Sequence, residues 1–338
     1  MACSFQPDAL AKYFVPKGPD GKKVTSGGTK FAHFTNPIQS QSIKNCHLIS
    51  ALSSLAWVNK AIFTPDRGTA TVVNFTFYDF APGSVTPRKV YVNSNLFSDG
   101  TNPCGAISNN WDTVDHESWP ALWEKAFAKF CMYKILKNPE NQPYYSLEDL
   151  QNSAKDPVYS LLPKGSDWGG NPVTVMNWIL NKPALNYTPW DASFTYGAST
   201  YTNFYDLIKN GTCKTPIIPA GCNGAKTLSS MGAWTYLNNT EARKKSPNVT
   251  YDTTALVADH SYSLLGIFEE SGKRYIVLRN PFGKYDPTGL PVGTVGTGPW
   301  KYKEGASTLT FEFTPNDGVF ALEETTFKAY FERFGVVG

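Results

Sequence analysis

The sequence has no long apolar run and little charge of either sign. No stretch approaches the roughly 18 apolar residues that a membrane-spanning helix requires, and the first residues lack the basic patch and apolar run of a secretory signal. We therefore expect a cytoplasmic protein, or a secreted one whose leader has been removed. The net charge is only +3 over 338 residues, with acidic and basic residues interspersed. This balance argues against nucleic acid or a membrane surface as a partner.

Cysteine and histidine are also scarce. Six cysteines in a chain of this length are too few for a disulfide scaffold. There is no C-x-x-C motif, and the four histidines form no short pair at metal-ligand spacing. The sequence therefore predicts no metal site, requires no cofactor, and favours reduced thiols. Asn-x-Ser/Thr triplets such as Asn74-Phe75-Thr76 keep secretion open.

The residues that are present indicate a globular α+β protein, with 41% hydrophobic and 14% aromatic residues. Apolar residues at helical spacing predict helices over 46–57, 117–136, 173–181 and 201–210. Alternating and β-branched runs predict strands within 69–96 and at 217–218, 260–268, 274–279 and 307–313, with a hairpin turn at Gly272-Lys273. Residues 138–172 have the composition of loops. A helical first half and a β-rich second half favour a cleft between them.

Cys46 lies in the first turn of the first predicted helix, with Asn45 before it as a suitable N-cap. The N-terminus of a helix carries about half a positive charge, which favours a thiolate over a thiol. On this helix alone an alternative stays open, because unpaired cysteines often serve as small, inert core residues.

Four segments resemble calpain-type cysteine proteases, a papain-like family. The run Asn45-Cys46-His47-Leu48-Ile49 resembles the nucleophile segment, and Asp259-His260-Ser261-Tyr262-Ser263 resembles the histidine strand. Arg279-Asn280-Pro281-Phe282-Gly283 matches the Arg-Asn-Pro-aromatic-Gly element. The helix segment 119–129, Trp-Pro-Ala-Leu-Trp-Glu-Lys-Ala-Phe-Ala-Lys, matches a structural motif of the family. The four follow the family's order and cover about residues 37–290.

The resemblance implies a papain-like two-lobed fold with the active site between a helical first lobe, residues 1–182, and an antiparallel β-rich second lobe, residues 183–338. It implies a cysteine endopeptidase with Cys46 as nucleophile, His260 as its proton partner and Asn280 as the group that orients the imidazole. The chemistry agrees, because a thiolate forms a thioester that the same imidazole helps to hydrolyse. The partner would be a protein or peptide substrate.

The sequence departs from the family at the oxyanion donor. The family places a glutamine six residues before the cysteine, where position 40 is serine. Gln39 and Gln41 flank it, and a loop shifted by one residue would restore the donor. Loss of that donor would cost about 2.7–4 kcal/mol of transition-state stabilisation. The aromatic residue after the nucleophile is His47, and the ring after Asn-Pro is Phe282 rather than Trp.

Two other functions remain open on the sequence. The serine at position 40 would suit a catalytically inactive, protease-like binding module. A Cys-His acyltransferase would share the chemistry, although such enzymes usually orient the histidine with aspartate. Calcium is implied by the family resemblance alone, since no ligand set carries over onto this chain. The oligomeric state cannot be read from the sequence.

Overall fold

The computed structural model describes residues 4–6, 16–17, 29–30, 33–39, 43–59, 63, 66–67, 71–98, 105–108, 118–157, 171–213, 221–253, 255–304 and 306–338. This part of the chain is a mixed α+β structure with mostly antiparallel sheets. Its helices are α1 (Cys46–Val58), α2 (Trp119–Lys134), α3 (Leu147–Gln151), α4 (Pro172–Leu180), α5 (Phe204–Asp206), α6 (Asn239–Arg243) and α7 (Glu324–Tyr330).

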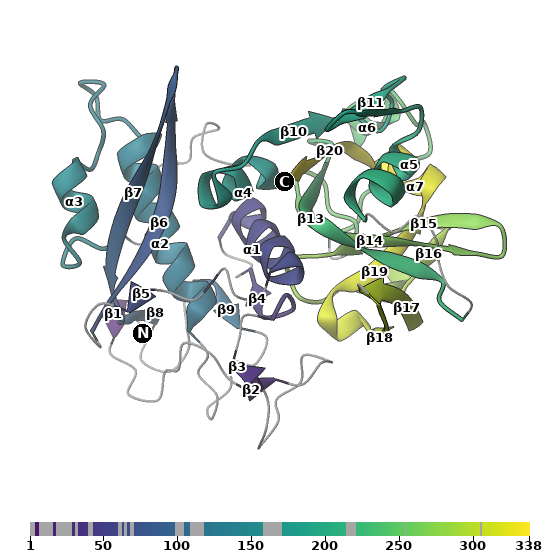
Figure 1. Cartoon of the computed structure of the whole chain (residues 1–338), viewed down its shortest axis with the longest axis horizontal. Coiled ribbons are helices and arrows are strands. Elements are labelled where there is room, and N and C mark those ends of the chain that lie inside the picture. Colours follow the sequence, from purple (N-terminus) through teal and green to yellow (C-terminus); the bar gives the residue numbers. More distant parts are fainter. Residues whose placement is uncertain are drawn as a thin grey trace.

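Helix α1 forms the centre of the molecule. It lies between two groups of elements (Figure 1). On one side are α2 and the hairpin of β6 (Val72–Ala81) and β7 (Ser84–Asn93), and on the other are strands β13 (Gly224–Thr235) and β14 (Ser261–Glu270). All but the last of its 13 residues are buried, so apolar and small residues surround its whole circumference. A helix of this kind is stabilised by packing on every face rather than by an amphipathic stripe.

The part of the chain before residue 182 supplies a hairpin and the helices α2, α3 and α4, of which α2 and α4 contact α1. Strand β6 (Val72–Ala81) pairs with β7 (Ser84–Asn93), and β5 (Asp66–Arg67) extends this sheet. The indole of Trp123 on α2 packs edge-on against the β6 rings of Phe75 and Phe77, at 4.7 and 5.6 Å between centroids. Alternate β6 residues therefore face α2, as the period of a strand requires.

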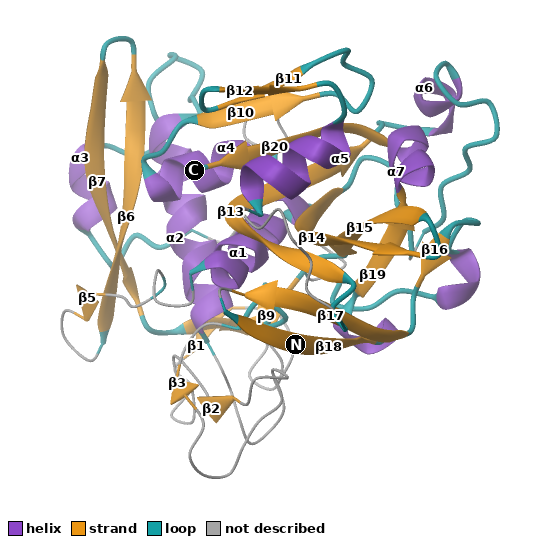
Figure 2. Ribbon diagram, turned by 45° about the vertical axis from the view of Figure 1, so that its right-hand side comes forward, coloured by secondary structure: helices purple, strands orange, loops and turns teal. Residues whose placement is uncertain are grey.

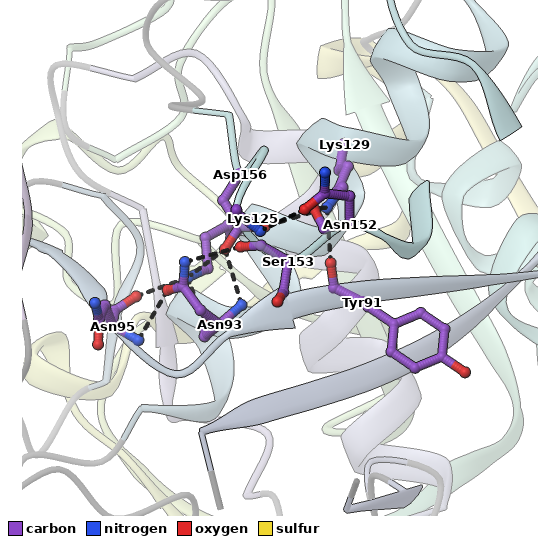
Figure 3. Close-up of polar contacts among 9 residues, drawn as sticks. Tyr91, Asn93, Asn95, Lys125, Lys129, Asn152, Ser153 and Asp156 are labelled. Carbon is purple, nitrogen blue, oxygen red and sulfur yellow. Dashed lines mark hydrogen bonds and ion pairs between the residues drawn. The ribbon is translucent and has the colours of Figure 1, made fainter. Parts of the chain in front are cut away.

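Buried charges also fix α2 to its surroundings (Figure 3). The ammonium groups of Lys125 and Lys129 lie 3.1 and 3.2 Å from the carboxylate of Asp156. Lys125 also donates to the main-chain oxygens of Asn93 and Asn95. The two lysines thus join α2 to the end of β7 and to the segment after α3.

The second half of the chain forms the large sheet. Its main path runs β10-β20-β13-β14-β15-β19-β16, with β17 and β18 attached through β13. The strands are β10 (Ala184–Tyr187), β13 (Gly224–Thr235), β14 (Ser261–Glu270), β15 (Lys273–Arg279), β16 (Thr294–Val295), β17 (Gly298–Glu304), β18 (Ser307–Phe313), β19 (Val319–Glu323) and β20 (Phe331–Val337). Helices α5 and α7 lie against this sheet in Figure 2.

Four further pairs of strands, each strand two or three residues long, lie outside these two sheets in the described part of the chain. They are β1 (Ser4–Gln6) with β8 (Leu96–Ser98), β2 (Pro16–Lys17) with β3 (Thr29–Lys30), β4 (Pro37–Ile38) with β9 (Ile107–Ser108), and β11 (Phe194–Tyr196) with β12 (Ser199–Tyr201). Of these, β4 matters for the site, because the chain runs from it toward the start of α1.

Most predicted elements are present. The helices expected at 46–57, 117–136 and 173–181 correspond to α1, α2 and α4, and the three later strands correspond to β14, β15 and β18. The 201–210 segment begins with the end of β12 and continues as α5 and a π-helical turn, Leu207–Thr212. The segment 138–172, expected as loop, contains α3. The strand expected at 217–218 lies outside the described residues.

The hairpin turn between β14 and β15 was predicted one residue too late. Its two central residues are Ser271 and Gly272, with φ of 52° and 76°, and Lys273 already pairs with Glu270. Two consecutive positive φ values fit the tight turn whose twist matches the strands. Within the described ranges, no helix is both long and apolar enough to cross a bilayer.

Candidate active site

Cys46 begins α1 and is 9% exposed. As the sequence predicted, Asn45 occupies the N-cap position of α1, although its side chain makes no capping hydrogen bond. Its amide nitrogen donates instead to Glu124 on α2. The residue before the cysteine is therefore held by another helix rather than by its own.

Glu124 is a buried carboxyl that tethers two backbone segments near the site. It accepts the Asn45 amide, and its other oxygen accepts the Ala106 N–H at 2.8 Å. A Cβ on Gly105 would lie 2.2 Å from that second oxygen, so only glycine allows this approach. Burial raises the pKa of Glu124 to about 7, because desolvation disfavours the charged form.

The environment of the Cys46 sulfur contains opposing effects. Burial raises its thiol pKa, and the charge of Asp259 acts in the same direction. Hydrogen bonds from the Ser261 N–H, the Ser261 hydroxyl and the His47 N–H lower it. The net direction is upward, the reverse of what the helix terminus alone suggested, because desolvation outweighs the donors.

His260 and Asn280 meet at the open end of the β14–β15 hairpin. Ser263 pairs with Arg279 at the last rung of the ladder, so the residues just beyond it on the two arms lie side by side. The imidazole Nε2 is 3.0 Å from Asn280 Oδ1. As expected from the sequence, the hairpin brings the two side chains into contact.

The Asn280 amide has a defined orientation. Its Oδ1 also accepts the Phe282 N–H at 3.0 Å, and its Nδ2 donates to the Ala255 carbonyl at 3.4 Å. An oxygen facing the ring can only accept, so Nε2 carries the proton and Nδ1 holds the lone pair of the neutral imidazole. Asn280 thereby selects the tautomer of His260.

Two aromatic rings shield the imidazole of His260 from solvent. Phe282 lies over it at 4.6 Å between centroids and Tyr262 meets it edge-on at 5.1 Å, leaving the histidine 5% exposed. Burial lowers its pKa to about 4, and the Asn280 hydrogen bond opposes this only in part. The isolated imidazole is therefore neutral at physiological pH.

Strand β14 rests directly on α1. The Ser263 hydroxyl donates to the Ser50 carbonyl at 2.7 Å, and the Trp57 indole N–H donates to the Leu265 carbonyl at 2.7 Å. These contacts fix α1, the helix that begins with Cys46, against the strand that follows His260. Cys46 interacts with Asp259 and Ser261, the residues on either side of that histidine.

Arg279, like Glu124, is a buried side chain that links several segments near the site. The sequence showed it only as part of the Arg-Asn-Pro motif, without this role. Its guanidinium is fully buried and donates to Ser53 Oγ on α1, to the Thr35 carbonyl and to the Asp317 carbonyl, at 2.7, 2.7 and 3.2 Å. Burial lowers its pKa to about 9. One side chain thus ties β15 to α1, to the segment before β4 and to the loop before β19.

Of the two predicted oxyanion donors, Gln39 lies within the described residues and Gln41 does not. Gln39 is buried, its N–H donates to the Pro281 carbonyl at 2.8 Å, and its side-chain nitrogen donates to the Ile43 carbonyl at 2.7 Å. Gln39 therefore joins the loop before α1 to the segment after Asn280. Ser40 and Gln41 lie outside the described residues.

His47 is buried and packs against Phe127 of α2, at 6.1 Å between ring centroids. Burial lowers its pKa to about 4. Its ring belongs to the α1–α2 interface rather than to a surface. The described ranges contain no group of three or more His, Cys, Asp or Glu side chains that could hold a metal ion.

Comparison with known proteins bears on the class of this chain. No protein-family model matches the chain. The chain is similar to a protein named "Thiol protease" from Porphyromonas gingivalis (strain ATCC BAA-308 / W83), with 24% identity over 290 residues, which are 82% of this chain and 50% of that protein. The chain thus spans about half the length of the curated relative that it matches.

Proposed function

We propose that the chain is a cysteine endopeptidase core of the calpain type, with a papain-like two-lobed fold divided near residues 182 and 183. The observation that carries the proposal is the contact between His260 Nε2 and Asn280 Oδ1. It commits one ring nitrogen to an orienting amide and leaves Nδ1 for a nucleophile. The similarity to a protein named thiol protease supports the same class.

In this proposal Nδ1 of His260 accepts the proton of the Cys46 thiol. Each group alone resists charging, since burial raises the pKa of Cys46 and lowers that of His260. Transfer creates a thiolate and an imidazolium together, and their attraction in a water-poor site offsets the desolvation of both. Asn280 would hold the imidazolium in place through its carbonyl oxygen.

The reaction follows from that pair. The thiolate attacks the peptide carbonyl carbon, and the proton on Nδ1 passes to the leaving amine as the C–N bond breaks. The thioester is then attacked by water, whose proton returns through Nδ1 to the sulfur. Side-chain N–H groups of Gln39 or Gln41 would stabilise the oxyanion together with the main chain at the start of α1.

The proposed substrate is an extended protein or peptide segment, and the proposed compartment is the cytoplasm. Calcium control is proposed from family resemblance alone, and no step depends on it. An inactive binding module is the second candidate, because burial alone keeps the Cys46 thiol protonated. The Cys-His acyltransferase has no support in the described site beyond the shared residues.

Labelling with a peptidyl epoxide tests the proposal against the binding module. The reagent reacts with an activated thiolate guided by a peptide, so Cys46 should be alkylated at least a hundredfold faster than free cysteine. The rate of alkylation of the half-buried Cys222 is measured in the same digest as an internal comparison. His260→Ala should remove the faster alkylation of Cys46. Reaction of Cys46 no faster than Cys222 would reject the peptidase and favour the binding module.

A further inference from the structure

The ladder between β13 and β14 changes its hydrogen bonding at His260. Trp234 and Ser261 pair across the two strands in the ordinary way. At the next pair, the Thr235 N–H donates to the His260 carbonyl at 3.0 Å. In an antiparallel ladder the second residue of such a pair returns its N–H to the partner's carbonyl. The His260 N–H donates instead to the side-chain hydroxyl oxygen of Thr235, at 3.1 Å.

The backbone of Asp259 accounts for this change. Its φ is 51°, in the left-handed region that residues other than glycine seldom adopt. The chain therefore leaves the extended course of the strand directly before His260. Such a conformation persists only where neighbouring contacts hold it. The Asp259 N–H donates to the Tyr236 carbonyl at 2.9 Å, and the His260 N–H donates to Thr235, so the end of β13 holds both sides of this residue.

The Thr235 hydroxyl also holds the loop that leads to the histidine. A hydroxyl accepts and donates at the same time. While it accepts from His260, its own proton is directed at the Val257 carbonyl at 2.7 Å, with the His260 carbonyl more distant at 3.2 Å. Thr235 is 3% exposed, so solvent does not easily replace these bonds. One side chain thus joins β13, the loop before His260 and the main chain of His260.

We propose that Thr235 is a positioning residue for His260, whose hydroxyl fixes the main chain of the histidine so that the imidazole meets both Asn280 and Cys46. This inference rests on the proposed function, because it assigns a role in the same proton transfer. Asn280 fixes one atom of the ring, Nε2, and a ring fixed at one atom can pivot about it. The bond at the His260 N–H supplies a second fixed point. A displacement of a reacting group by about 1 Å can lower a rate about 100-fold.

Thr235→Val isolates the hydroxyl, because valine keeps the shape of threonine. It should lower kcat for peptide hydrolysis about 10- to 100-fold and leave KM within about twofold, since no contact with the substrate is lost. Thr235→Ser keeps a hydroxyl with a less restricted rotamer and should recover about a third or more of the wild-type kcat. Thr235→Ala gives the same test as valine if the valine variant does not fold.

Thr227→Val is the matched control. Thr227 is a fully buried threonine on the same strand, and its hydroxyl donates to the Leu265 carbonyl, farther along β14, at 3.2 Å. A loss of stability common to buried threonines should appear in both valine variants. A loss of kcat should appear only at Thr235.

A second readout does not require peptide cleavage. The Nε2–H of His260 is shielded by its contact with Asn280, so it should exchange slowly with water and give a proton signal in nitrogen-edited NMR spectra. His260→Ala identifies the signal by its loss. Thr235→Val should accelerate this exchange about tenfold or more, whereas Thr235→Ser and Thr227→Val should retain the wild-type rate.

The two readouts separate this inference from the proposed function. If the wild type cleaves peptides, kcat must fall and Nε2–H exchange must accelerate together in the Thr235 variants that lack a hydroxyl, and neither must change in Thr227→Val. Any other pattern overturns the role of Thr235. If the wild type cleaves no peptide, the peptidase proposal fails. The exchange rate alone then decides whether Thr235 positions the ring, and an unchanged rate overturns it.

Discussion

Replacing Glu124 with glutamine should remove a pH-dependent loss of stability that originates next to the start of the Cys46 helix. Glu124 is 5% exposed, and it accepts hydrogen bonds from Asn45 and Ala106. Burial raises its pKa from an ordinary 4.5 to about 7. The folded protein therefore keeps this proton over a range in which the unfolded chain has released it.

The sign and size follow from linkage. Between about pH 4.5 and 7 the folded state binds more protons at this site than the unfolded state, so the free energy of unfolding falls as pH rises. A displacement from 4.5 to about 7 corresponds to about 3 kcal/mol. The loss begins above the unfolded pKa and is complete once pH exceeds the folded one.

Urea unfolding at pH 5, 6, 7 and 8 measures this effect. His47 and His260, both with pKa lowered to about 4, act in the opposite direction, because stability rises with pH as the unfolded imidazoles lose their protons. The difference between wild type and Glu124→Gln is therefore the quantity to compare. It should change by about 2.5 kcal/mol from pH 5 to pH 8, because part of the change already occurs below pH 5. In contrast, Glu148→Gln, on the exposed surface of α3, should leave the profile unchanged. If the free energy of unfolding depends on pH in the same way in wild type and Glu124→Gln, the pKa of Glu124 is not raised in the folded protein.

Three further predictions concern the buried polar anchors and the orienting amide. Asp156→Asn leaves Lys125 and Lys129 without their counter-ion and should lower the free energy of unfolding by about 3–5 kcal/mol in urea; a loss below 1 kcal/mol, the usual range for an exposed pair, would contradict this. Arg279→Met leaves three buried acceptors without a donor and should lower the free energy of unfolding by about 3 kcal/mol or more. Arg279→Lys should restore little of this stability, because one ammonium group cannot reach three divergent partners. Full recovery of the thermal midpoint by lysine would contradict the three-way contact of the guanidinium. Asn280→Ala should lower kcat/KM about 10- to 100-fold. Asn280→Asp places a negative charge beside the ring, so it should raise the pKa of His260 above about 4 and move the dependence of activity on pH to higher pH. An unchanged pH dependence in Asn280→Asp would mean that residue 280 does not orient the ring.

The sequence was sufficient for the local elements near the site. Apolar residues at helical spacing after Cys46 predicted α1, and alternating residues after His260 predicted β14, because both patterns reflect one buried environment. The spacing of His260 and Asn280 across a short turn then implied their contact. Local periodicity and chain connectivity were enough for these inferences.

The same sequence could not show what the side chains at the site would contact. Asn45 is a good capping residue in isolation, but tertiary packing turns its amide to Glu124, which is 79 positions away. Helix position alone predicted an acidic thiol, whereas burial reverses the direction.

The most direct test of the central claim is detection of the acyl-enzyme. The chain is mixed with an activated peptide ester, quenched in acid within milliseconds, digested, and mapped by mass spectrometry. An acyl group should appear on the Cys46 sulfur and disappear on a longer incubation, and in His260→Ala an acyl group on this sulfur should persist. Peptide hydrolysis that survives Cys46→Ser, or an acyl group found only on another residue, would contradict the claim.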